Sequence, residues 1–225
     1  MKKAIYIFLF IISQSFFAQQ SNQLWKGYFS YNEIVDVESS TNAVFASTQN
    51  ALFSQVVASS NLNVYNSITG LKPDVITTIH HSDAFNKTFV GNNNGLILIQ
   101  NADGSVTTKV DVIEEVPVPP NKKKINDFFE FNGRLYIATD YGISVIDIAT
   151  SEFISTYFIG TSGEETEVLQ TTVFNNEIYA VTRSFGIRKA NLNNPNLFDF
   201  SQWQTFDTGF WFGIVTFNNQ LIATN

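Results

Sequence analysis

One short pattern recurs along the chain at nearly constant spacing. A small residue is followed four positions later by a glycine or asparagine that opens the next apolar run, as Ala138 precedes Gly142. The glycine or asparagine recurs in steps of 45, 47 and 44 residues, at Asn50, Gly95, Gly142 and Gly186. Such a repeat restricts the fold to an array of similar supersecondary units.

Tight turns form a second marker with nearly the same period. They recur in two steps of 43 residues, at Asn132-Gly133, Asn175-Asn176 and Asn218-Asn219. Asparagine and glycine suit a two-residue hairpin because both turn positions need a positive φ. Two independent markers that keep one period establish the repeat.

The apolar segments and turns of each unit predict four short strands. In the third unit we expect strands over residues 125–131, 134–139, 143–148 and 152–159. These segments are apolar on both faces, which is typical of a sheet that is buried on both sides. Beyond the N-terminal segment, no part of the chain shows the period of an amphipathic helix.

Four antiparallel strands in every unit predict an all-β fold, a β-propeller built from four-stranded antiparallel blades. The small residues Ala46, Gly91 and Ala138 would let neighbouring blades approach closely. The alternative is a β-sandwich, but sandwiches do not keep a sequence period.

About four and a half blades are expected, so the propeller is predicted to be incomplete. The predicted blades span residues 34–71, 76–115, 125–165 and 168–210, with a partial blade over 212–225. The last strand pair stops at Asn225, so we expect an N-terminal part of a longer protein. Residues 25–31 resemble the outermost strand of a blade and are expected to complete a blade elsewhere in the ring.

Residues 1–18 are typical of an export signal, which leaves residues 19–225 as the propeller domain. Lys2 and Lys3 precede an apolar run over residues 4–12, which is too short to span a bilayer of about 30 Å. Cleavage is expected after Ala18, and a retained membrane anchor is the alternative. No other segment predicts a transmembrane span, so we expect an exported chain in the periplasm or at the outer-membrane cell surface.

The charge and the missing cysteines exclude several functions. The formal net charge is −7, and an acidic protein repels phosphate backbones, so no nucleic acid partner is expected. The chain has no cysteine, which excludes disulfides, thiolate metal sites and a cysteine nucleophile.

One basic run is a candidate ligand-binding site. Lys122, Lys123 and Lys124 follow three closely spaced prolines on a stiff loop between the second and third units. Three exposed lysines could bind the phosphates of an anionic glycolipid. A solvated connector is the simpler interpretation of such a run.

Other polar groups do not predict catalysis. His80 and His81 are adjacent on a predicted strand, so they point to opposite faces and do not form a two-ligand metal site by themselves. The carboxylates at 114–115 and 163–167 lie in predicted loops, and glycoside hydrolysis needs two carboxyls placed across a substrate. No P-loop, dinucleotide fingerprint, calcium loop or nucleophile elbow occurs. We therefore expect no enzyme, no metal and no cofactor.

An aromatic run lies near the last blade junction. Phe210, Trp211 and Phe212 could line a sugar-binding surface. We expect two of the three in the core, because blade interfaces need bulky apolar side chains.

Three stretches, residues 24–37, 119–128 and 131–148, resemble the N-terminal β-propeller of PorZ-like proteins of the type IX secretion system of Bacteroidetes. The resemblance covers essentially the whole mature chain and includes no catalytic motif. It implies a non-catalytic scaffold of a cell-surface attachment complex, with partners similar to the sortase PorU and its companions PorV and PorQ. It also implies delivery of anionic lipopolysaccharide to the sortase, and longer relatives with a second propeller and a C-terminal β-sandwich.

Two other functions stay open. The repeat also resembles the periplasmic propellers of hybrid two-component sensors, which continue into a membrane span and a kinase. A propeller-type polysaccharide lyase or hydrolase is the third alternative, and it would require paired carboxylates that face the central channel.

Overall fold

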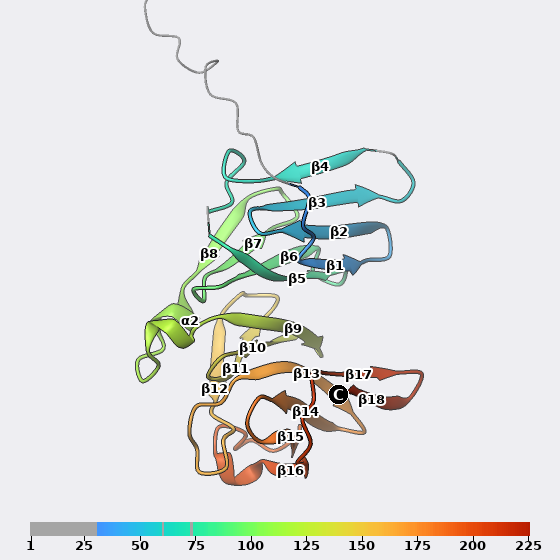
Figure 1. The fold of residues 1–225 in the computed structure, drawn as a ribbon. Coiled ribbons are helices and arrows are strands. Elements are labelled where there is room, and N and C mark those ends of the chain that lie inside the picture. The colour runs from blue at the N-terminus through green and yellow to red at the C-terminus, as the bar shows by residue number, and fades with distance from the viewer. Residues whose placement is uncertain (1–30, 60, 73) are drawn as a thin grey trace, which may run out of the picture.

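The computed structural model describes residues 31–225, except residues 60 and 73. The predicted export signal therefore lies outside the described residues, as do residues 25–30 of the predicted outermost strand. The described chain forms five antiparallel sheets that follow one another along an open arc (Figure 1).

Four of the sheets have four strands, and we name them blades 1 to 4 in chain order. Blade 1 contains β1 (Asp36–Ser39), β2 (Ala43–Thr48), β3 (Ala51–Val56) and β4 (Leu62–Tyr65). Blade 2 contains β5 (Ile76–Ser82), β6 (Lys87–Asn92), β7 (Ile97–Gln100) and β8 (Val106–Lys109). Blade 3 contains β9 (Ile125–Phe131), β10 (Arg134–Thr139), β11 (Gly142–Asp147) and β12 (Phe153–Tyr157). Blade 4 contains β13 (Val168–Phe174), β14 (Glu177–Thr182), β15 (Gly186–Asn191) and β16 (Gln204–Asp207). Partial blade 5 has two strands, β17 (Gly213–Phe217) and β18 (Gln220–Thr224).

Within every sheet, each strand pairs with the next one along the chain. The first strands of the five sheets, β1, β5, β9, β13 and β17, lie side by side and form the inner edge of the arc (Figure 1). This arrangement confirms the predicted all-β fold of an incomplete β-propeller.

The connector between blades 2 and 3 contains two short helical turns, although no segment shows the period of an amphipathic helix. This connector contains the single turn α2 (Asp111–Glu114) and the 3₁₀ turn η3 (Pro120–Lys122). Another 3₁₀ turn, η4 (Phe200–Gln202), precedes β16. Segments of three or four residues are too short to show a helical period, so the sequence pattern could not reveal them.

The repeated turns have the predicted backbone conformation. Asn132 and Gly133 have φ values of 50° and 73°, and Asn175 and Asn176 have values of 48° and 62°. Asparagine and glycine accept this left-handed region more readily than other residues, which explains why the turn residues recur with the blades.

The other repeated marker, a glycine or asparagine, lies at the start of the third strand of a blade or just before it. At Gly186, which has a φ of 65°, a β-carbon would collide with the carbonyl oxygen of Asp207 on the adjacent fourth strand. Gly91, a small residue of the marker, packs against the next blade: a β-carbon there would lie 2.7 Å from Ile125 Cγ2. At Gly91 the predicted close approach of neighbouring blades is therefore confirmed.

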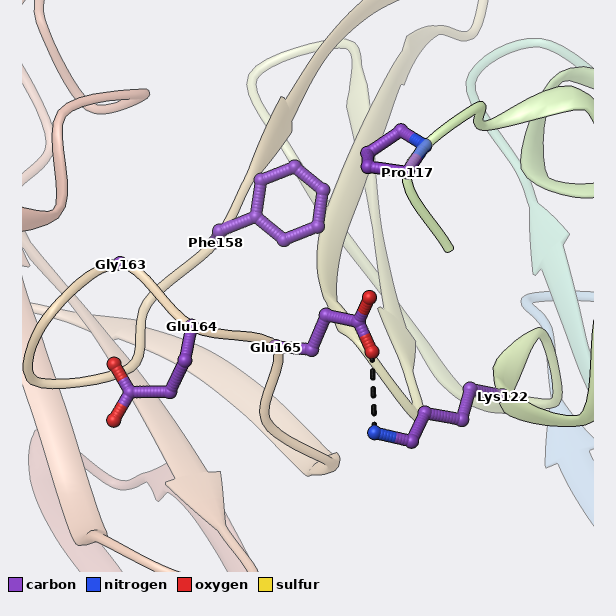
Figure 2. A pocket seen from close by; sticks show the side chains of 6 residues that line it. All are labelled: Pro117, Lys122, Phe158, Gly163, Glu164 and Glu165. Carbon is purple, nitrogen blue, oxygen red and sulfur yellow. Dashed lines mark hydrogen bonds and ion pairs between the residues drawn. The ribbon is translucent and has the colours of Figure 1, made fainter. Parts of the chain in front are cut away.

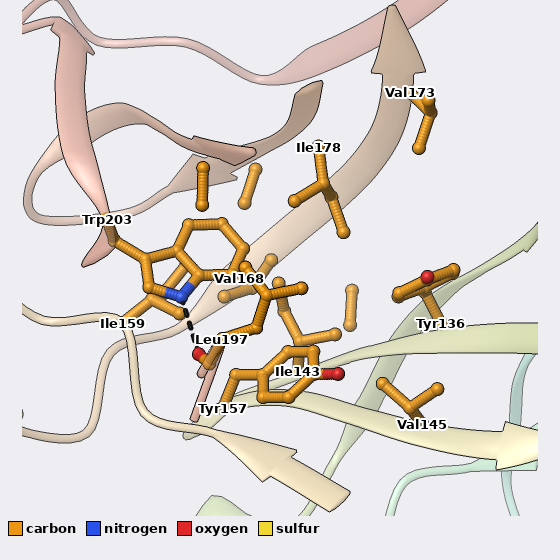
Figure 3. Close-up of a cluster of buried hydrophobic side chains, with 13 residues drawn as sticks. Tyr136, Ile143, Val145, Tyr157, Ile159, Val168, Val173, Ile178, Leu197 and Trp203 are labelled. Carbon is orange, nitrogen blue, oxygen red and sulfur yellow. Dashed lines mark hydrogen bonds between the residues drawn. The ribbon is translucent and has the colours of Figure 1, made fainter. Parts of the chain in front are cut away.

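The core lies between the blades. Between blades 3 and 4, Trp203 is 3% exposed and Tyr157 packs beside it (Figure 3). The indole nitrogen of Trp203 donates to the carbonyl oxygen of Leu197 at 2.9 Å, so burying this ring leaves no polar atom unpaired. Apolar side chains on both faces of a blade are thus covered by the two neighbouring blades.

The expectation for the aromatic run near the last junction is wrong. Phe210 and Phe212 are 85% and 64% exposed, and only Trp211 packs against the apolar cluster between blade 4 and partial blade 5. The indole of Trp211 donates to Asp207 at 2.8 Å. Phe210 and Phe212 lie before β17, outside the sheet that covers this cluster.

Candidate functional site

Polar side chains on the inner strands join each blade to the next. The carboxylate of Asp36 accepts a hydrogen bond from the backbone nitrogen of Ile79 at 2.9 Å, and Glu38 accepts one from that of His81 at 2.7 Å. The residues of each pair are 43 positions apart, which is one repeat. Similar bonds in the later blades link Asn126 to Val168 and Gln170 to Ile214.

His80 lies between two carboxylates that come from different blades. Its Nδ1 is 2.8 Å from Glu38 of blade 1, and its Nε2 is 2.9 Å from Glu130 of blade 3. The His80 side chain is 14% exposed. Burial alone would lower the pKa of His80, but hydrogen bonds and charge interactions with the two carboxylates outweigh it and raise the pKa above the usual 6.5. His80 therefore connects three successive blades, and we call the group of His80, Glu38 and Glu130 the His80 bridge.

A further carboxyl group lies close to the His80 bridge. Burial, followed by the charge of Asp36, raises the pKa of Asp127 on β9 to about 8. The inner strands thus gather several acidic groups around one histidine. Among the described residues, no group of three or more histidine, aspartate or glutamate side chains is arranged to hold a metal ion.

His81 has a different environment from its neighbour. Its ring stacks on Phe45 of blade 1 with centroids 4.2 Å apart, and its Nδ1 lies 2.9 Å from Thr88 Oγ1. Burial lowers the pKa of His81. The two histidines therefore contact different groups, as the strand pattern predicts.

The structure separates the three lysines of the basic run. Lys123 is 6% exposed, and its ammonium donates to the carbonyl oxygens of Ile113 and Glu115 within the connector. Lys122 is exposed and pairs with Glu165 at 3.1 Å, whereas Lys124 is half-buried. Lys123 stabilises the connector and does not share an exposed cluster with Lys122. Ligand binding by Lys122 and Lys124 stays a prediction.

Lys122 lines a rim cavity of about 490 Å³ between two blade connectors (Figure 2). Its lining residues are Pro117, Lys122, Phe158, Gly163, Glu164 and Glu165. Glu164 accepts from the backbone nitrogen of Ser162 at 2.6 Å, and backbone hydrogen bonds lower the pKa of this carboxyl. The cavity thus combines an aromatic ring with charges that are already compensated.

Sequence reasoning missed the His80 bridge. Glu38 lies about one repeat before His80, but Glu130 lies 50 residues after it, so no common spacing marks the three residues. The contact arises because the inner strands of three blades converge at the inner edge of the arc.

No helix within the described residues has both the length and the apolar character to cross a membrane. A search of curated proteins finds no match to the chain. The similarities to solved structures are low in sequence and clear in fold, and the chain spans about a quarter of the length of the first two structures below.

PorZ, reported as an essential surface component of the type IX secretion system of Porphyromonas gingivalis, is 19% identical with a TM-score of 0.71. The match covers 84% of this chain and 25% of that one. The extracellular domain of a hybrid two-component system of B. thetaiotaomicron is 15% identical with a TM-score of 0.65, over 87% of this chain and 26% of that one. The computationally designed Ika8 protein is 12% identical with a TM-score of 0.61, over 88% and 56% of the two chains.

A sequence model of one family matches residues 44–204, which is more than half of the chain. The matched region begins in β2 and ends at β16, so it includes parts of all four complete blades. The protein therefore belongs to the family of N-terminal β-propeller domains of PorZ of the type IX secretion system.

Proposed function

We propose that the protein is an exported scaffold and ligand-binding propeller of a type IX secretion complex at the cell surface. The observation that carries this proposal is the family match over residues 44–204. The similarity in fold to PorZ, with a TM-score of 0.71, supports it. Export rests on the predicted signal over residues 1–18, and the extracellular origin of a second structural relative agrees with it.

The partners in this proposal are a sortase and companions similar to PorU, PorV and PorQ. The ligand is anionic lipopolysaccharide, which the propeller would present to the sortase. Lys122 and Lys124 are the candidate contacts from the basic run. Lys122 would have to leave Glu165 to bind a phosphate, at a modest cost because the Lys122 side chain is 48% exposed.

We also propose that the domain is not catalytic. A lyase or hydrolase needs carboxyls that are free to approach a substrate, and the inner strands do carry several carboxylates. Asp36 and Glu38 are occupied by backbone nitrogens of blade 2, and Glu38 and Glu130 by His80. These contacts support a role in joining the blades.

A sensor domain of a two-component regulator is the second candidate function. The extracellular domain of the hybrid two-component system of B. thetaiotaomicron has a TM-score of 0.65 to this chain, close to the value of 0.71 for PorZ. The blade array alone fits both roles, and the family match over residues 44–204 favours the secretion role.

Deleting the gene in the bacterium that encodes it separates the two functions. The secretion role predicts that cargo proteins of the type IX system are released without attached lipopolysaccharide, and that the wild-type gene restores their surface retention. The sensor role predicts normal cargo attachment with altered transcription in response to a glycan. Normal cargo attachment in the deletion strain would overturn the proposed secretion role.

A further inference from the structure

A polar cavity of about 370 Å³ opens between blades 3 and 4, away from the basic run. The residues that line it are Phe131, Asn132, Arg134, Tyr136, Leu192, Asn193, Asn194 and Pro195. The first four come from the β9–β10 hairpin of blade 3, and the other four from the segment that follows β15 in blade 4. Blades 3 and 4 each have all four strands, so both walls of this cavity come from complete blades.

Arg134 is the charged residue of this cavity. The chain has three arginines. Arg183 pairs with Glu167 at 3.1 Å, and Arg188 is buried and donates to carbonyl oxygens. Arg134 is exposed and makes no ion pair with any described residue. The hydroxyl of Tyr136 is a hydrogen-bond partner of Arg134, and the other donors of its exposed guanidinium are available to an external anion.

The nearest carboxylate on the neighbouring strand does not compensate this charge. Asp147 is opposite Arg134 in the β10–β11 pairing. Its carboxylate instead accepts from the backbone nitrogen of Thr150 at 2.9 Å and from the Thr150 hydroxyl at 3.2 Å. The fork of donors on Arg134 can therefore bind a carboxylate or phosphate in two-pronged geometry.

Amide groups surround the guanidinium. Asn194 is held in place, because its amide nitrogen donates to Gln202 at 2.7 Å and its oxygen accepts from the backbone nitrogen of Asn196 at 2.9 Å. The exposed side chains of Asn132 and Asn193 make no hydrogen bond with the described residues. Two amides that each offer a donor and an acceptor suit the hydroxyl groups of a sugar.

The apolar wall of the cavity is aromatic. Phe131 lies nearly parallel to Phe129, with an interplanar angle of 8° and ring centroids 6.5 Å apart. Tyr136 is buried in the cluster behind them (Figure 3). Rings that are packed from behind form a rigid wall, which binds the apolar face of a ligand at a low entropic cost.

We propose that this cavity binds an anionic sugar, with Arg134 on its carboxylate or phosphate and Asn132 and Asn193 on its hydroxyls. The inference deepens the proposed function, on which it rests for the source of the sugar, and it adds a site separate from Lys122 and Lys124. The carboxylate of a uronic acid and the phosphate of a sugar ester share the chemistry that Arg134 recognises.

The test is a titration of the purified, isotopically labelled protein with glucuronate, glucose 1-phosphate, glucose and inorganic phosphate, followed by NMR. We expect saturable shifts of the Asn132 and Asn193 side-chain amides with glucuronate or glucose 1-phosphate. Arg134→Gln should bind at least about tenfold more weakly, because a charge-assisted hydrogen-bond pair is lost. Arg134→Lys keeps the charge but not the fork and should be intermediate.

Arg183→Gln is the matched control, since it removes an exposed arginine elsewhere and should leave binding unchanged. Unaltered backbone signals outside the cavity check the fold of each variant. Absence of saturable shifts with both anionic sugars, or equal binding by Arg134→Gln, would overturn the site. If inorganic phosphate causes the same shifts as glucose 1-phosphate, the cavity does not recognise the sugar. Gene deletion tests the secretion role separately. If the titration fails but the deletion strain releases its cargo proteins, only the sugar site is refuted.

Discussion

Replacing His80 by glutamine tests whether the His80 bridge holds three blades together. Glutamine has a similar size and can keep one hydrogen bond, but it carries no charge. In the variant, Glu38 and Glu130 would face each other across a neutral side chain. We expect lower stability of the blade array and a changed dependence of stability on pH.

The size of the effect follows from the contacts and their burial. The contacts of His80 measure 2.8 and 2.9 Å, and the two carboxylate side chains are 25% and 22% exposed. Hydrogen bonds to charged groups contribute about 1.5–3 kcal/mol, and exposed ion pairs about 0.2–1 kcal/mol. For these partly exposed groups we expect about 1 kcal/mol for each contact, hence a loss of about 2 kcal/mol near pH 6. In a chain of this length that corresponds to a decrease in Tm of roughly 4–8 °C.

The sign of the pH dependence follows from the direction of the pKa shift. The pKa of His80 is raised above 6.5 in the folded protein, so the folded state keeps a proton that the unfolded state has released. The contribution of His80 is complete below pH 6.5 and is lost as the pH rises through the folded pKa. The difference in unfolding free energy between the wild type and His80→Gln should therefore shrink in alkaline solution.

Urea unfolding at about pH 6 and about pH 9 measures this difference. The chain has only two histidines, so His81→Gln leaves a single imidazole signal in NMR that reports the pKa of His80 directly. His81→Gln is also the control for stability, because burial lowers the pKa of His81 and its pH trend has the opposite sign. The reasoning is refuted if His80 titrates below 6.5, or if His80→Gln loses the same stability at both pH values.

Three other substitutions test the packing of the blades. Asp127→Asn should raise the unfolding free energy by about 1–3 kcal/mol near pH 8, because the folded carboxyl keeps its proton up to about pH 8 while the unfolded one ionises near 3.8. Urea unfolding should show this gain growing as the pH rises from about 4 to about 8. Gly91→Ala should cost about 1–3 kcal/mol, because its β-carbon would lie 2.7 Å from Ile125 Cγ2; unchanged thermal stability would contradict the close approach. Trp203→Ala should cost about 3–5 kcal/mol by opening a cavity between blades 3 and 4, measured by urea unfolding; a loss below about 1 kcal/mol would show that this interface does not depend on the indole.

The repeating parts of the fold could be predicted because they obey local rules. The positive φ values of Asn132 and Gly133 belong to the two-residue turn itself, so the residue types at these positions predict the turn. The predicted bounds of β9 and β10 agree with the structure, since β9 ends and β10 begins at this turn. The connectors contain short helical turns that the strand pattern does not indicate.

The basic run could be predicted as a candidate site, but the burial of its members and the contacts between blades could not. The sequence does not distinguish the three lysines of the basic run. In the structure, Lys123 is buried and donates hydrogen bonds to two carbonyl oxygens of the connector. His80 meets Glu130 only because neighbouring inner strands converge. The exposure of Phe210 and Phe212 likewise depends on which strands cover them, and a local pattern does not contain that information.

The central claim, that this propeller works within a secretion complex at the cell surface, can be tested most directly by surface labelling and cross-linking in the native bacterium. A chromosomally tagged protein should react with a membrane-impermeant label on intact cells. Cross-linking followed by mass spectrometry should then join it to a sortase and its companions, as the family membership implies. Protection from the label, together with cross-links to an inner-membrane kinase, would contradict the account and favour the sensor function.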